Sequence, residues 1–340
     1  MSSELIRLKD AVQPVEVDGR VFLVADDVLE LGADASIMRA LELLKSGCLS
    51  DDLVRELGAE AEVLLEALQL ADLVRTGRLD AEPEEIWNTQ LAYLDDFVGD
   101  PAAAQRRLAG ARVAIVGVGG VGALVAQELT AAGVGALLLI DGDVVQHDNL
   151  NRQHLYSGDD VGQPKVACAA ARLESTSSSV QIATSQQFIW TSDDCQVIEA
   201  FRPHFVVNAA DEPPELEAHL GELARRSGVS FISGRVGRGR GFWGPLFSPG
   251  LTQCPVCARA DLEAEEDPLL RRLRQETARH PIRASFGPTN TTVSALIAKD
   301  VLLSIAAGFE HAFSGGAYCA IDFETMGVSR QALAERCSCW

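Results

Sequence analysis

RVAIVGVGGVG, residues 112–122, carries the strongest structural signal in the chain. Its apolar half predicts a buried parallel strand, and its glycines predict a tight turn into a helix that ends near Gly133. Gly117, Gly119 and Gly122 let backbone N–H groups approach phosphate oxygens at the positive end of the helix dipole. The stretch therefore predicts a nucleotide site. The same spacing is typical of NAD and FAD folds, so it leaves the nucleotide open.

Composition narrows the class of protein. With 340 residues, of which 47% are hydrophobic, the chain is long enough for a large core and about two domains. The net charge of −20 disfavours nucleic acid as a partner, because proteins that bind it present basic surfaces. The start of the chain lacks a basic region followed by an apolar core, and no apolar run reaches the length of a bilayer span. We therefore expect a cytoplasmic protein without a membrane partner.

Residues 1–80 are predicted to form a small winged-helix-like α+β domain. Alternating residues at 15–24 surround Asp18-Gly19, which is typical of a hairpin, and three short helical patterns follow. The region holds 17 acidic against 8 basic side chains, which disfavours DNA binding. Two alternatives remain. The domain recognises an extended leader peptide that adds a strand beside the hairpin, or it serves dimerisation or packing.

Residues 81–110 are expected to form a linker and a helix, and residues 111–340 a doubly wound, Rossmann-like, mostly parallel sheet. An acidic stretch at 80–85 marks the linker, and the amphipathic pattern at 86–99 predicts the helix. After the glycine turn, apolar strand patterns alternate with helical ones, as a doubly wound sheet requires. The chain is therefore expected to be an α/β protein.

The second strand of this sheet, predicted at 136–140, ends at Asp141. An acid at this place binds ribose hydroxyls in NAD sites and in ATP sites alike. Arg152 and Lys165 follow, and an NAD site has no need of two cations near the phosphates. Lysine is scarce in this chain, so Lys165 indicates a specific need for a compact charge beside a triphosphate. These residues favour ATP over NAD.

A further predicted strand, 205–208, leads into Asp211. The carboxyl ends of parallel strands meet at one edge of a sheet, where ligands of this fold bind. Carboxylates hold Mg²⁺ together with phosphate oxygens. Asp211 is therefore predicted as a Mg²⁺ ligand, and the alternative, a helix N-cap, is compatible with that role.

Four of the eight cysteines form two close pairs, Cys254 with Cys257 and Cys337 with Cys339. Eight cysteines are too few for a disulfide scaffold in so long a chain, and paired thiolates are typical of a closed structural zinc site. Zinc bound there would attach the end of the chain to the region of the first pair. The alternative is that these thiols are free.

Three arginines lie among glycines in the stretch 233–241, namely Arg235, Arg238 and Arg240. Guanidinium groups bind carboxylates through paired hydrogen bonds, so the stretch is a candidate site for an acidic peptide. A solvated hairpin is the equal alternative. The charged segment 261–280 is interpreted as a cover over the site or as a surface helix.

Together these motifs resemble those of ubiquitin-activating-type adenylating enzymes, the ThiF/MoeB superfamily. They come in the same order: the glycine turn, IDGD at 140–143, NLNRQ at 149–153, GQPK at 162–165, Asp211 and CPVC at 254–257. The likeness covers residues 85–340. It is closest to the MccB-like branch, which matures ribosomally made peptides, through segments 242–250 and 284–290. The N-terminal region is similar to PqqD-like peptide-recognition domains.

The resemblance implies a homodimeric adenylyltransferase that uses ATP and Mg²⁺. The residues that it implies for ATP binding are Gly117, Gly119, Gly120, Gly122, Asp141, Asp143, Asn149, Arg152, Gln153 and Lys165. Arg152, Lys165 and Asp211 would be catalytic, because they neutralise charge on the phosphates during AMP transfer. The implied substrate is a carboxylate or amide of a ribosomal precursor peptide, in peptide natural-product (RiPP) and antibiotic biosynthesis.

Three features depart from the family pattern. Ile86 and Thr89 stand where the family has arginines that reach the ATP of the other subunit. No cysteine occurs at 258–285, so a thioester on the enzyme is not expected. The C-terminal cysteine pair is CxC in place of CxxC. Two other functions therefore stay open: a sulfur-carrier (ubiquitin-like protein) adenylyltransferase, and a non-catalytic protein that presents a peptide to another enzyme.

Overall fold

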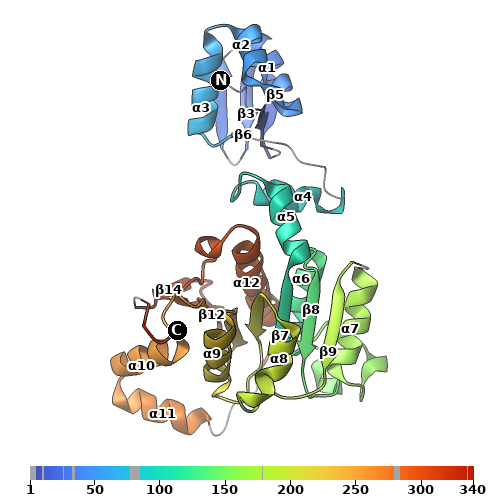
Figure 1. The fold of residues 1–340 in the computed structure, drawn as a ribbon, viewed down its shortest axis with the longest axis vertical. Helices are drawn as coiled ribbons and strands as arrows, with labels where there is room; N and C mark the ends of the chain where they lie inside the picture. The colour runs from blue at the N-terminus through green and yellow to red at the C-terminus, as the bar shows by residue number, and fades with distance from the viewer. Residues whose placement is uncertain are drawn as a thin grey trace. The chain divides into compact units, whose positions relative to one another are not determined.

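The chain divides into two compact units, Met1–Arg106 and Arg107–Trp340 (Figure 1). The structure, a computed structural model, describes residues 5–9, 11–25, 27–32, 35–76, 85–177, 179–278, 284–334 and 336–340. The predicted acidic linker, 80–85, lies outside the described residues except for the backbone of Glu85. Each unit is described separately below.

The first unit contains two small sheets and the helices that cover them. One sheet has the strand order β5-β1-β6 and the other β2-β3-β4. The strands are β1 (Leu5–Leu8), β2 (Gln13–Val17), β3 (Arg20–Val24), β4 (Val28–Gly32), β5 (Cys48–Leu49) and β6 (Val74–Thr76). The helices are α1 (Ala35–Ser46), α2 (Ser50–Leu57) and α3 (Glu60–Leu70). One apolar core joins these elements and includes Leu23, Leu41, Leu53 and Leu68.

The predicted hairpin is confirmed as β2 and β3. Val17 pairs with Arg20 across a two-residue turn, in which Asp18 and Gly19 have φ angles of 51° and 74°. Positive φ at both central residues produces the twist that two antiparallel strands need. The third strand, β4, was not predicted, because its few alternating residues are too short a pattern to stand out.

The prediction of one helix over 86–99 is wrong beyond the first half of that range. A short 3₁₀ turn (Glu85–Trp87) leads into α4 (Asn88–Leu94), and α5 (Pro101–Gly110) begins at a proline. Asp95 is buried just after α4, where its Oδ1 lies 2.7 Å from Nε of Arg75 in β6. This ion pair joins segments far apart in the sequence, so the amphipathic pattern carried no sign of it.

The second unit is built on an eight-stranded sheet with the order β14-β13-β12-β11-β10-β7-β8-β9. The strands are β7 (Arg112–Val116), β8 (Ala136–Ile140), β9 (Gln181–Ser185), β10 (Phe205–Asn208), β11 (Ser230–Val236), β12 (Arg240–Phe247), β13 (Ala317–Asp322) and β14 (Val328–Ala332). The run from β11 to β9 is parallel, and the three strands beyond β11 are antiparallel. The predicted mostly parallel, doubly wound sheet is confirmed.

Helices cover both faces of this sheet (Figure 1). The helices of this unit are α6 (Gly122–Ala131), α7 (Lys165–Thr176), α8 (Gln196–Phe201), α9 (Leu216–Ser227), α10 (Pro255–Glu265), α11 (Pro268–Ala278) and α12 (Gly287–Ala306). Leu216, Leu220 and Leu223 of α9 share a core with alternate residues of the central strands, such as Ala114 and Val116. Because β7 and β8 are buried on both faces, their sequences are continuous apolar runs. Among the described residues, no helix is both long and apolar enough to cross a membrane.

A buried carboxylate on α12 ties the antiparallel part of the sheet together. Asp300 is 1% exposed and accepts hydrogen bonds from Trp243 Nε1 (3.3 Å), Phe313 N (2.9 Å), Ser314 N (2.9 Å) and Ser314 Oγ. These donors belong to β12 and to the segment before β13. A single side chain therefore holds three elements in place.

Replacing Asp300 with alanine is expected to lower the free energy of unfolding by about 3 kcal/mol, because several buried donors lose their acceptor at once. Denaturant unfolding of the full chain measures this change. Exposed Asp159 provides the control, and Asp159→Ala is expected to change stability by less than about 0.5 kcal/mol. Equal effects of the two variants would contradict the bracing role of Asp300.

Candidate functional site

The glycine turn at the carboxyl end of β7 is packed too tightly for side chains at three of its positions. A Cβ on Gly117, whose φ is +87°, would lie 2.8 Å from the backbone of Ala209. A Cβ on Gly122 would lie 1.9 Å from the carbonyl oxygen of Gly117. A Cβ on Gly120 would lie 2.3 Å from the amide of Asn290 in α12. The protein itself therefore requires these glycines.

Gly119 differs, because a Cβ there would have its nearest neighbour only at 3.8 Å, at Nε2 of Gln153. This distance is an ordinary van der Waals contact, so the packing of the protein does not itself require glycine here, whereas a backbone that approaches a phosphate does. Gln153 is 5% exposed, and its Oε1 has no hydrogen-bond partner within the described part of the chain. A buried acceptor without a donor next to this glycine indicates a site that a polar ligand completes.

Asp141 connects the end of β8 to the glycine turn. Its Oδ2 accepts a hydrogen bond from Val118 N, and its Oδ1 accepts one from Asp143 N, both at 2.8 Å. Tyr156 donates its hydroxyl to the carbonyl of Val118 at 2.6 Å. Burial, and then the charge of Asp141, raise the pKa of Tyr156, so its hydroxyl stays a neutral donor. The turn is therefore held rigid from both sides before any ligand arrives.

Lys165 begins α7 and is paired with Asp143. Its Nζ lies 2.9 Å from Oδ2 of Asp143, and its backbone N–H donates to the carbonyl of Asp143 at 3.0 Å. The lysine side chain is 7% exposed and the aspartate side chain 56%. The cation is therefore directed towards the loop that follows Asp141. The sequence motifs assign both residues to ATP but carry no sign that the two side chains pair with each other.

Asn149 ends a 3₁₀ segment (His147–Asn149), and Arg152 and Gln153 lie in the turn that follows it. Asn149 is buried, and its Oδ1 accepts a hydrogen bond from Gln146 N at 3.1 Å. Arg152 donates through Nη1 to the carbonyl of Asp148 and to Asn151 Oδ1. Asn149 therefore shapes the turn, and Arg152 is held by local acceptors.

Asp211 is exposed and lies three residues beyond the end of β10. The two residues before it include Ala209, whose backbone contacts the site of Gly117. Asn208 holds this loop, because its Oδ1 accepts from Ala210 N and its Nδ2 donates to Ser233 Oγ, both at 3.3 Å. The loop that carries Asp211 thus begins beside the glycine turn. Its assignment to Mg²⁺ stays a prediction.

The three arginines assigned to the substrate lie on the β11–β12 hairpin. Arg235 is exposed on β11, with its guanidinium carbon 5.3 Å from the ring centroid of Phe242. Arg238 is exposed at the tip of the hairpin. Nε of Arg240 lies 3.3 Å from Oδ2 of Asp322 in β13. The stretch thus forms the hairpin that the alternative interpretation expects. The role of the three arginines in substrate binding stays a prediction.

Glu217 is an acidic residue near this hairpin that the sequence analysis did not single out. It stands in the first turn of α9 and is half-buried. Burial raises the pKa of its carboxyl, while a hydrogen bond from Ser233 and the charges of Arg235 and Arg259 act in the opposite direction. Burial likewise raises the pKa of nearby Tyr318 to about 12, and Glu217 adds to that shift. The helix pattern alone carried no sign of this cluster.

Glu217→Gln is expected to stabilise the protein at neutral pH and to leave it unchanged at low pH. Since the pKa of Glu217 is raised in the folded state, the folded chain binds more protons than the unfolded chain between the two pKa values. Wild-type stability therefore falls as pH rises through that window, by about 1.4 kcal/mol per unit of pKa shift. Thermal unfolding of both proteins between pH 4 and 8 measures the difference.

Exposed Glu222, on the same helix, is the matched control. Its hydrogen bond and charge pairing with Arg225 lower its pKa, so Glu222→Gln is expected to show the opposite sign. If Glu217→Gln were less stable than wild type at pH 7, the carboxylate would be favoured by its arginine neighbours, and the prediction would be wrong.

The four predicted zinc ligands lie together. Their Sγ atoms are all within 4.8 Å of one another, and those of Cys257 and Cys339 are 3.5 Å apart. Sulfur atoms around zinc are expected about 3.8 Å apart, so this donor set fits a tetrahedral site. Trp340, the last residue, donates its ring N–H to the carbonyl of Thr252 at 2.7 Å. The end of the chain is thus attached beside α10.

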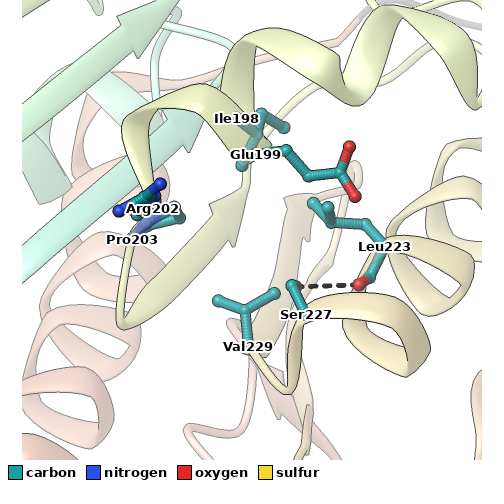
Figure 2. A pocket seen from close by; sticks show the side chains of 7 residues that line it. All are labelled: Ile198, Glu199, Arg202, Pro203, Leu223, Ser227 and Val229. Carbon is teal, nitrogen blue, oxygen red and sulfur yellow. Dashed lines mark hydrogen bonds between the residues drawn. The ribbon is translucent and has the colours of Figure 1, made fainter.

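A separate pocket lies between α8 and α9 (Figure 2). It is lined by Ile198, Glu199, Arg202, Pro203, Leu223, Ser227 and Val229. Pro203 and Val229 precede β10 and β11, so the pocket is at the amino edge of the sheet. None of its lining residues belongs to the predicted nucleotide site.

The fold and this site define a class, the doubly wound α/β proteins with a glycine turn, a buried acid and a lysine gathered at one edge of the sheet. The chain belongs to the ThiF family, because residues 88–340 match that family. This result confirms the resemblance drawn from the motifs.

Curated relatives match part of the chain. The SAMP-activating enzyme E1 of Haloferax volcanii is 36% identical over 132 residues, which are 39% of this chain and 48% of that protein. The sulfur carrier protein ThiS adenylyltransferase of Bacillus subtilis is 33% identical over 159 residues, 46% of each protein. The chain therefore spans less than half the length of these relatives.

Solved structures match nearly the whole chain. E. coli MccB with ATP superimposes with a TM-score of 0.81 and 19% identity, over 98% of both chains. PaaA superimposes with a TM-score of 0.71 and 20% identity, over 96% of this chain and 99% of that one. At this identity the likeness shows a shared fold.

Proposed function

We propose that this protein is an adenylyltransferase that transfers AMP from ATP to a carboxylate or amide of a ribosomally made peptide. The observation that carries the proposal is the buried, unpaired Oε1 of Gln153 next to Gly119, in a glycine turn fixed through Asp141. In this arrangement the triphosphate lies on the turn, the ribose lies at Asp141, and Gln153 accepts a hydrogen bond from the ligand. Family membership supports the same chemistry.

The roles of the site residues in the reaction follow from the negative charge that develops on the phosphates. An oxygen of the substrate attacks the α-phosphorus, the bond from that phosphorus to the bridging oxygen breaks, and pyrophosphate leaves. Negative charge grows on the leaving group, so Lys165 and Arg152 are assigned to neutralise it. Asp211 would hold Mg²⁺, which supplies further neutralisation on the phosphates. No general base is needed for a carboxylate, because it is already ionised at neutral pH.

The peptide is assigned to the first unit and to the arginine hairpin. The sheet β2-β3-β4 has two edge strands, and an extended peptide adds to such an edge through backbone hydrogen bonds. Val15 and Val17 of β2 and Val28 of β4 are exposed on these edge strands and offer apolar contacts. MccB, described as a microcin C7 biosynthetic enzyme, has been solved in complex with N-formylated MccA. We assign Arg235, Arg238 and Arg240 to acidic groups of the peptide.

Four further assignments belong to this proposal. The protein has a peptide-recognition domain at 1–80, a linker and helix at 81–110, and an adenylation domain at 111–340. It acts as a cytoplasmic homodimer. It holds one structural Zn²⁺ on its paired cysteines. Its products enter peptide natural-product and antibiotic biosynthesis.

A second function is favoured by the curated relatives. One of them is named a SAMP-activating enzyme E1 and another a sulfur carrier protein ThiS adenylyltransferase. In that case the substrate would be the C-terminal carboxylate of a ubiquitin-like sulfur carrier. The same nucleotide site would support adenylation of either substrate, so only a direct assay with each substrate distinguishes the two functions.

The test is ATP–pyrophosphate exchange with the wild-type protein and with Asp211→Ala. Candidate peptides encoded beside the gene are compared with a small ubiquitin-like carrier. Exchange that depends on a peptide and is lost in the variant is the expected result. Exchange that depends on the carrier alone would establish the second function. Peptide binding without binding of Mg-ATP would replace both with a non-catalytic presenter.

A further inference from the structure

The pocket between α8 and α9 combines an apolar wall with a charged rim. Ile198, Leu223 and Val229 are buried and form the apolar wall. The volume of the pocket is about 260 Å³. Pockets for drug-sized molecules start at about 300 Å³, so this space suits a smaller ligand of about eight to ten non-hydrogen atoms.

Arg202 is a cation of this rim that no acid neutralises. The other charged residue that lines the pocket, Glu199, is already paired, because its Oε1 lies 3.1 Å from Nε of Arg226. The exposed guanidinium of Arg202 has no hydrogen-bond or ion-pair partner within the described part of the chain. Figure 2 shows Arg202 and Pro203 at one end of the pocket and Glu199 and Leu223 at the other. An anionic group is therefore directed to the end that holds Arg202.

The polar backbone groups around this end are also satisfied. The carbonyl of Phe201, at the end of α8, accepts hydrogen bonds from Nε (3.0 Å) and Nη2 (2.5 Å) of Arg112. This cation offsets the partial negative charge of the helix end. Arg112 and Arg202 thus stand at one edge without a carboxylate partner among the described residues, in a chain whose net charge is −20. Such a local excess of positive charge attracts anions.

The backbone at Arg202 favours another residue type. Its φ and ψ angles are 51° and 58°, in the left-handed region that is unfavourable for a residue with a Cβ. The N–H of Arg202 ends α8 by donating to the carbonyls of Ile198 (3.2 Å) and Glu199 (3.0 Å). Glycine adopts this conformation without strain and would end the helix equally well. An arginine here therefore indicates a use for its guanidinium.

We propose that this pocket binds a small carboxylic acid with an apolar body. The carboxylate pairs with Arg202 through two parallel hydrogen bonds, and the hydrocarbon part lies against Ile198, Leu223 and Val229. The pocket is at the amino edge of the sheet, whereas the nucleotide is assigned to the carboxyl edge. The proposal is therefore independent of AMP transfer.

Calorimetric titration of the full-length protein with hexanoate tests this site. Hexanoate, with about eight non-hydrogen atoms, is expected to bind with a Kd of about 1 mM or less. Hexylamine has a chain of the same length and the opposite charge, and it is expected to bind at least about tenfold more weakly. Arg202→Asn is expected to raise the Kd for hexanoate at least about tenfold. Asparagine tolerates the left-handed conformation, so this variant keeps the end of α8.

Two further variants locate the ligand. Ser227 is half-buried in the wall of the pocket, where it donates to the carbonyl of Leu223 at 2.8 Å (Figure 2). Ser227→Leu places an apolar side chain in the space of the ligand and is expected to raise the Kd at least about tenfold while leaving Arg202 in place. Arg225→Gln removes an exposed cation of the same helix that does not line the pocket, and it is expected to change the Kd by less than about twofold. Thermal unfolding confirms that each variant is folded.

The absence of binding heat with hexanoate up to about 20 mM would overturn the proposal. A folded Arg202→Asn protein with the wild-type Kd would overturn it as well, and so would equal affinity for hexanoate and hexylamine. Binding that Ser227→Leu leaves unchanged would place the ligand outside this pocket and would also contradict the proposal.

Discussion

Lys165→Met is expected to lower peptide-dependent ATP–pyrophosphate exchange by about 10²- to 10³-fold, the loss typical of removing one preorganised charge from a transition state. The lysine side chain is 7% exposed and enters the site from the start of α7, with its ammonium already desolvated and oriented by Asp143. A charge in that position costs little reorganisation when pyrophosphate leaves. Methionine keeps much of the length of the side chain and removes the charge. Initial rates at saturating ATP measure the effect on kcat.

Lys299→Met is the matched control. Lys299 is an exposed lysine on α12, and its replacement is expected to change the rate by less than about twofold. Thermal unfolding of both variants shows whether the fold is retained. A folded Lys165→Met protein whose rate falls by less than about tenfold would contradict the assignment of Lys165 to the phosphates.

Removal of the metal from the cysteine cluster is expected to lower the melting temperature by about 10 °C or more. A structural zinc contributes several kcal/mol, and 1 kcal/mol corresponds to about 2 to 4 °C in a unit of this size. The four thiols join α10 to the last residues of the chain, which are otherwise attached through Trp340. Elemental analysis is expected to find one zinc per chain, and treatment with a chelator is expected to produce the loss of stability.

Two cysteine variants test this site without a chelator. Cys257→Ser removes one ligand and is expected to reproduce the effect of the chelator. Cys168→Ser changes a half-buried thiol outside the cluster and is expected to alter stability by less than about 1 kcal/mol. A wild-type protein that keeps its melting temperature after the metal is removed, or a Cys257→Ser protein that melts at the wild-type temperature, would contradict a structural zinc site.

Much of the second unit could be predicted from sequence because its signals are local. The continuous apolar runs of β7 and β8 belong to strands buried on both faces. The glycines that determine the turn after β7 lie close together in the sequence. The Asp18-Gly19 turn is local in the same way, since two consecutive residues with positive φ determine the hairpin. The two cysteine pairs came together as predicted, because close spacing in each pair is itself a metal-ligand signal.

The remaining features depend on contacts between segments distant in sequence. Asp95, just after α4, pairs with Arg75 of β6, and Asp300 accepts hydrogen bonds from β12 and from the segment before β13. The same holds for the site, where Gly142 meets Phe188, Gly120 meets Asn290, and burial shifts the pKa of Glu217. Periodicity and spacing describe one segment at a time, so they located the glycine turn and suggested which acids to assign to the site. Burial and pairing across the sheet are properties of the packed chain, and they determined which of the other side chains surround that site.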